Sequence, residues 1–100
     1  MANRLELQST LEEILGSSQV YFQPPPSIKM AYPAIVYELT DIDVKHANNI
    51  AYITVPGFKI TLIDRNPDSE FVSEILKLPK CKFNTFFTVD NLNHFVFSKY

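Results

Sequence analysis

The chain has one cysteine and two glycines in 100 residues, and each scarcity excludes a class of site. The single thiol, on Cys81, cannot form an internal disulfide, so nothing points to an oxidising compartment and an intracellular protein is favoured. Two glycines cannot build the glycine-rich loop whose backbone amides hold nucleotide phosphates. The sequence therefore predicts neither a disulfide-stabilised secreted domain nor a phosphate-binding loop.

The chain also lacks a net positive charge and long apolar runs. The formal net charge at pH 7 is -2, whereas binding to a phosphate backbone normally uses a broad basic surface. No apolar run approaches the roughly 20 residues of a membrane-spanning helix. Glutamates lie among the leucines near the N-terminus, which does not fit a signal peptide. Nucleic-acid binding and a membrane role are both disfavoured.

Apolar and aromatic residues are abundant, at 46% and 13% of the chain. One hundred residues suffice for one hydrophobic core, so we expect a single folded domain spanning residues 1–100. The interior of a domain of this size does not readily need 13 aromatic rings. Some of the rings are therefore expected to be covered by a partner.

Two helices are predicted. Asn3 caps the first, whose leucines and isoleucine recur at helical spacing until Gly16. Asn66 and Pro67 then form a helix-start signal with the following acidic residues, and the apolar stripe behind them predicts a second helix from Pro67 to Leu78.

Runs of β-branched and aromatic residues predict the first strands, and alternating apolar residues predict the later ones. A short edge strand at residues 20–23 ends at three prolines, and a buried strand follows at residues 34–39. The polar segment 40–51 predicts a solvated loop or, if residues 52–55 pair back, a long hairpin arm from Asp41 to Pro56. A bulge or bend is expected at Pro56 and Gly57. Residues 58–63 form the next strand, and residues 83–97 form a C-terminal hairpin in which Phe83 and Phe87 share a face. The fold class is α+β: an antiparallel or mixed sheet with two helices on one face and a long hairpin arm.

Neither of the two candidate chemical sites is convincing. Asp41, Asp43 and His46 could ligate a metal, but a polar loop explains them better because no further histidine or cysteine cluster has ligand spacing. Cys81 and His94 could form a nucleophile and base, but an isolated cysteine usually behaves as a small apolar residue. We therefore expect no catalytic, cofactor or metal site, and no enzyme activity.

The aromatic residues near the C-terminus point instead to a protein interface. Phe86 and Phe87 are adjacent, so they point to opposite faces of a strand, and Phe95 to Phe97 and Leu62 with Ile63 repeat this pattern. Only one face can lie under the helices. An uncovered apolar face usually marks self-association or docking, although a core on both sides of the sheet is the alternative. The candidate interface residues are Asp43, Lys45, His46, Asn48, Asp64, Arg65, Phe86, Asn93 and Phe95.

Polar members of this set have simpler alternatives. Asp64 and Arg65 could form an intersubunit ion pair or an exposed helix cap, and exposed ion pairs contribute little to stability. Asn93 could contact a partner at the hairpin end, where turn formation already explains the neighbouring Asp90 and Asn91.

Four strings in this order resemble small tail-terminator, or tail-completion, proteins of long-tailed bacteriophages: LEEILG, VYFQPPPSIKMAYPAIVYEL, ITLIDRNPDSE and FTVDNLNHFVF. The likeness covers nearly the whole chain. It implies a non-enzymatic, typically hexameric ring that is assembled in the host cytoplasm and lies at the head-proximal end of the virion tail. The ring would cap the tail tube protein, end its polymerisation and face the head-tail connector protein, with DNA only as passing cargo.

The resemblance also implies that the hairpin from about Asp41 to Pro56 reaches neighbouring subunits or the tube. Two other functions stay open. One is a head-to-tail joining, or neck, protein of the same particle, and the other is a monomeric intracellular adaptor or inhibitor that binds through the aromatic face.

Overall fold

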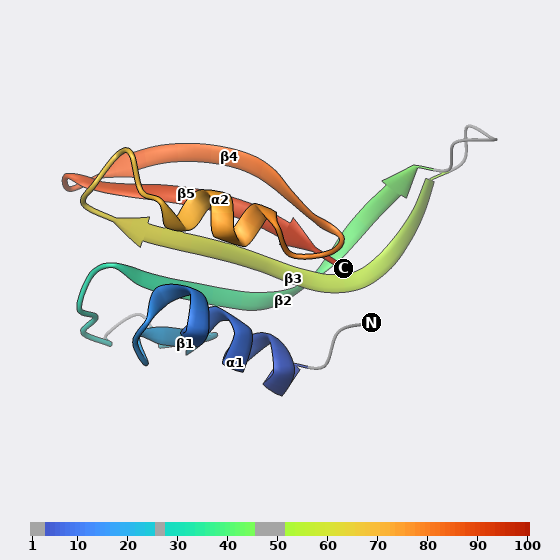
Figure 1. Cartoon of the computed structure of the whole chain (residues 1–100). Helices are drawn as coiled ribbons and strands as arrows, with labels where there is room; N and C mark the ends of the chain where they lie inside the picture. Colours follow the sequence, from blue (N-terminus) through green and yellow to red (C-terminus); the bar gives the residue numbers. More distant parts are fainter. Residues whose placement is uncertain (1–3, 26–27, 46–51) are drawn as a thin grey trace.

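The computed structural model describes residues 4–25, 28–45 and 52–100, without the side chains of residues 42–45 and 52–55. Its elements are α1 (Arg4–Leu15), β1 (Val20–Phe22), β2 (Ala34–Lys45), β3 (Tyr52–Asp64), α2 (Phe71–Leu76), β4 (Cys81–Val89) and β5 (Leu92–Lys99). Figure 1 shows both helices packed beside one five-stranded sheet. The predicted α+β class is confirmed.

The strand order in the sheet is β1-β2-β3-β5-β4. β1 is parallel to β2, and the other neighbours are antiparallel, so the sheet is mixed. β1 and β4 are the two edge strands. The short edge strand predicted before the prolines is confirmed, because β1 ends at Phe22.

β2 and β3 pair along their whole length, from Ala34 opposite Ile63 to Lys45 opposite Tyr52. β5 joins β3 only from Phe58 onward. Beyond that point the hairpin projects from the domain, and we call residues 40–45 and 52–57 the arm (Figure 1). The predicted hairpin arm is confirmed in its backbone, while residues 46–51 lie outside the described residues.

Of the bulge or bend predicted at Pro56 and Gly57, the bulge is absent, because Asp41 faces Pro56 and Thr40 faces Gly57 without a shift of register. Figure 1 shows that the pair of β2 and β3 curves away from the rest of the sheet toward the arm. Pro56 lies beyond the end of β5, where β3 has a strand on one side only. A residue without an N–H group is tolerated in such an edge position.

The main core lies between the helices and one face of the sheet. By the register, the side chains that alternate inward on β2, β3 and β5 are on this helix-bearing face. Their burial against α1 and α2 forms the cluster of Leu7, Leu11, Leu15, Ile35, Tyr37, Phe58, Ile60, Leu62, Ile75, Phe95 and Phe97. The hydroxyl group of Tyr37 also donates a hydrogen bond to the Gln8 side chain, which ties β2 to α1.

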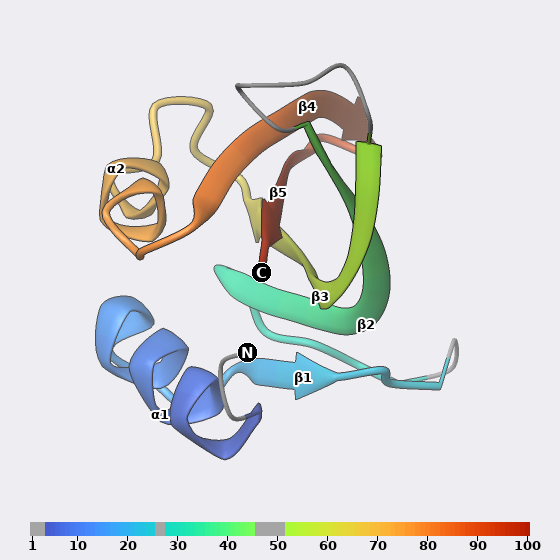
Figure 2. The same ribbon diagram turned by 90° about the vertical axis from the view of Figure 1, so that its right-hand side faces the viewer.

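The opposite face is closed at its centre as well. Ala34, Ile63 and Val96 are buried there without a helix above them. Figure 2 shows how strongly the sheet curves. Curvature and small side chains allow neighbouring strands on this face to shield one another. The prediction that Leu62 with Ile63, and Phe95 to Phe97, leave one face uncovered is therefore wrong.

The second helix begins later than predicted. α2 starts at Phe71 rather than Pro67, and the capping position is Glu70, which makes no side-chain cap. The Asp64 carboxylate accepts a hydrogen bond from the Asn66 amide at 3.0 Å, and the Asn66 side chain accepts one from the Asp68 amide at 2.9 Å. These two turns satisfy the local backbone in a non-helical conformation. The capping residues therefore shape a loop, and only one turn and a half of helix follows.

The predicted C-terminal hairpin is confirmed. Asp90 and Asn91 both have positive φ, at 53° and 64°, as a two-residue turn between antiparallel strands requires. Within the hairpin, the register between β4 and β5 shifts between Phe83 and Thr85. This irregularity determines which phenylalanines share a face.

Candidate protein-interaction surface

β4 exposes an unusual number of large apolar side chains. It pairs only with β5, and every residue from Lys82 to Val89 is exposed. The exposed fractions are 43% for Phe83, 46% for Phe86, 44% for Phe87 and 50% for Val89. We call these four residues the β4 surface. Four large apolar side chains exposed along one edge strand favour a protein interface.

The exposed rings are held in place by β5. The Phe83 ring lies 5.6 Å from that of Phe97, and the Phe86 ring lies 5.1 Å from that of Phe95, measured between centroids. Phe87 is stacked on the imidazole of His94 at 4.6 Å. Each ring therefore has one supported side and one open side. A partner that binds here meets side chains that have already lost much of their freedom.

The register shift changes the predicted grouping of these rings. Strict alternation places Phe83 with Phe87, but the extra residue in β4 puts Phe83 opposite Phe97 and Phe86 opposite Phe95. Phe83 and Phe86 thus lie together on the helix-bearing face, while Phe87 lies on the opposite face. The prediction that Phe86 and Phe87 point to opposite faces is confirmed.

β4 carries one charged residue, Lys82, near its beginning. From Phe83 to Val89 no side chain is charged, and Lys82 and Asp90 bracket the run. Natural edge strands usually carry charges, prolines or a covering element that prevents pairing with another chain. The other edge strand, β1, is only three residues long, and the Gln8 amide of α1 donates a hydrogen bond to its Val20 carbonyl at 3.2 Å. β4 is the open edge of the sheet.

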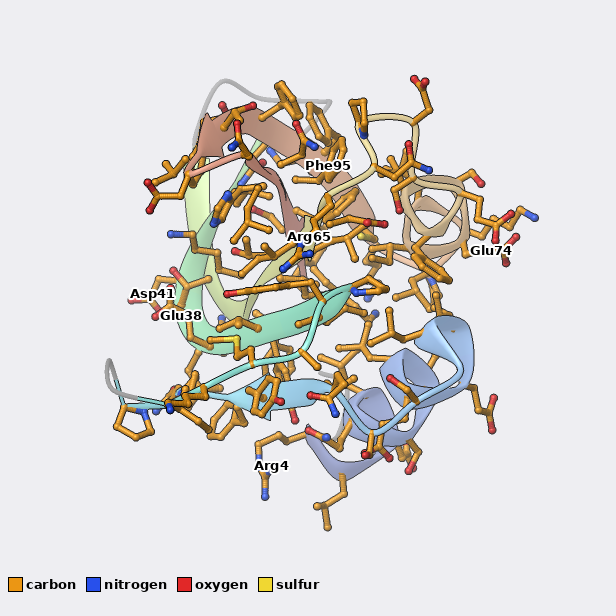
Figure 3. All side chains as sticks on the ribbon, turned by 90° about the vertical axis from the view of Figure 1, so that its left-hand side faces the viewer. Arg4, Glu38, Asp41, Arg65, Glu74 and Phe95 are labelled. Carbon is orange, nitrogen blue, oxygen red and sulfur yellow. The ribbon has the colours of Figure 1, made fainter. Side chains whose placement is uncertain are left out.

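Among the predicted interface residues, Phe86 belongs to the β4 surface, but Phe95 does not. Phe95 is 8% exposed and lies beneath Phe86 in the core, and Figure 3 shows it in the interior. Little of the Phe95 side chain is therefore available to a partner in the single subunit, and its contact role stays a prediction.

Asp64 and Asn93 are also buried, each 8% exposed, so little of either side chain is available to a partner, and their contact role stays a prediction. The Asn93 amide donates hydrogen bonds to the carbonyls of Asp64 and Arg65, at 3.1 and 3.2 Å. Its oxygen accepts a hydrogen bond from the Thr88 hydroxyl at 3.2 Å. Asn93 therefore fastens the C-terminal hairpin to the end of β3, and Asp64 shapes the following turn.

Arg65 is exposed, and its guanidinium group lies 6.0 Å from the ring centroid of Tyr32. It lines a hollow of about 520 Å³ at the end of the hairpin, together with Asp90, Asn91 and Leu92. Arg65 and Asp90 bring opposite charges to the lining of this hollow, which is therefore polar.

The remaining predicted contacts belong to the arm. The backbone at Asp43 and Lys45 is part of β2. Their side chains, and the whole of His46 and Asn48, lie outside the described residues, so their role in an interface stays a prediction.

The sequence did not single out Leu39. It is 56% exposed although it follows a run of buried strand residues. β1 pairs with β2 only as far as Tyr37, so Leu39 lies past the covered part of the sheet. With Thr40, Asp41, Pro56 and Gly57 it lines a hollow of about 450 Å³, which we call the arm-base hollow. The alternation of apolar residues in the sequence does not indicate where β1 stops pairing with β2.

The described residues offer little for catalysis. The Cys81 thiol is half-buried, and this burial raises its pKa, which lowers its reactivity. Lys99 lies opposite Cys81 and donates a hydrogen bond to the Pro79 carbonyl at 2.7 Å. In the described part of the chain no three acidic, cysteine or histidine side chains gather as metal ligands. No helix within those residues is long and apolar enough to cross a membrane.

Comparisons of the chain with protein-family models, with curated proteins and with solved structures gave no match.

Proposed function

We propose that this chain is a structural subunit of a bacteriophage tail that assembles into a closed ring, typically of six copies. The ring caps the tail tube at its head-proximal end, stops its polymerisation and presents a surface to the head connector. The resemblance of the sequence to tail-terminator proteins suggests the role, and the exposed apolar side chains of β4 support association.

The observation that carries the proposal is the open β4 edge with its four exposed apolar side chains. An aromatic strand edge is unfavourable on a lone subunit, because it invites pairing with any other strand. In a closed ring each such edge is covered by a neighbour, and no edge is left to propagate. The projecting arm gives the same subunit a second, separate element with which to reach a neighbour or the tube.

Two other functions make different use of the same surface. A neck protein would also form a ring but would not act on the tube. A monomeric adaptor would cover the β4 surface with one unrelated protein, and self-association would play no part.

A tube-growth experiment separates these functions. Purified tail tube protein from the same phage is polymerised with and without the chain, and tube length and tube ends are recorded by electron microscopy. We expect short tubes that carry a ring at one end. Rings that leave tube growth unchanged would favour the neck role, and a protein that forms no ring and does not bind tubes would contradict the proposal.

A further inference from the structure

We draw no further inference here: the strongest candidate, the apolar surface of the edge strand β4 formed by Phe83, Phe86, Phe87 and Val89, carries none because nothing in the structure shows what covers it.

Discussion

Asn93 joins two parts of the chain that are distant in sequence, through a single amide group. Its hydrogen bonds fix the end of β3 to the C-terminal hairpin, and the side chain is nearly inaccessible to water. Removal of a buried donor leaves its acceptors without partners, which costs more than the bond itself contributes.

Asn93→Ala is therefore expected to lower the free energy of unfolding by about 1–3 kcal/mol. Urea denaturation followed by circular dichroism measures this change. Asn91→Gly, in the exposed turn where φ is positive, is the control and should be nearly neutral. Equal stability of the wild type and Asn93→Ala would contradict the structural role assigned to this side chain.

Cys81 and Lys99 make stability depend on alkaline pH in opposite directions. Burial raises the pKa of the Cys81 thiol above 9.0, although the Lys99 charge opposes the shift. Burial likewise lowers the pKa of Lys99 below 10.5. The folded chain thus retains the thiol proton after the unfolded chain has lost it, and it loses the lysine proton first.

The thiol contribution can be isolated with Cys81→Ala. Relative to this variant, the wild type should lose stability as the pH rises above about 9, by at most about 1.4 kcal/mol per pH unit for one group. Urea denaturation under reducing conditions at pH 7 and pH 10 gives the comparison. A stability difference between the two proteins that is the same at both pH values would show that the thiol is not shielded.

At the scale of elements, α2 is a short helix held by few side chains. Ile75 is fully buried in the core, whereas its neighbour Leu76 is 42% exposed. Both are aliphatic residues of similar size in the same helix. Replacing each with alanine therefore separates the effect of burial on stability from that of helix propensity.

Ile75→Ala is expected to cost about 2–5 kcal/mol, because it removes buried methyl groups and leaves a cavity. Leu76→Ala should change stability by no more than about 0.5 kcal/mol. Thermal or urea unfolding of the pair measures the difference. Similar losses for both variants would mean that α2 does not pack on the sheet through Ile75.

The elements also show which parts of the fold were predictable. Runs of β-branched and aromatic residues and regular alternation predicted the strands, and the helical spacing of Leu7, Leu11 and Leu15 predicted α1. The start of α2 was mispredicted because aspartate and asparagine cap turns as readily as helices. The register shift in β4 was not predictable, since nothing in the local sequence distinguishes a strand that shifts at Asn84 from one that alternates throughout.

At the scale of the whole molecule, the sequence likewise predicted only part of the candidate interface. Phe86 was predicted because adjacent phenylalanines cannot both face one core. The burial of Phe95 was not predicted, because the sequence of one strand does not show the strand order that makes β5 an inner strand and β4 an edge. Leu39 was missed for the related reason that its exposure depends on where β1 and β5 end.

The whole molecule combines a short edge strand that contacts α1, an aromatic edge strand and a projecting arm. The Gln8 amide of α1 donates a hydrogen bond to β1, while β4 exposes four large apolar side chains. A subunit with such an asymmetric surface is suited to head-to-tail association, in which each copy offers one surface and receives another.

The central claim is that copies of this chain associate through β4, and the mass of the protein in solution tests it most directly. Light scattering over a wide range of concentrations is applied to the wild type and to Phe86→Lys, with circular dichroism to verify that both are folded. The account predicts that the wild type reaches a discrete ring mass and that folded Phe86→Lys remains a monomer at the same concentrations. A wild type that is monomeric throughout, or a folded Phe86→Lys that assembles like the wild type, would contradict it.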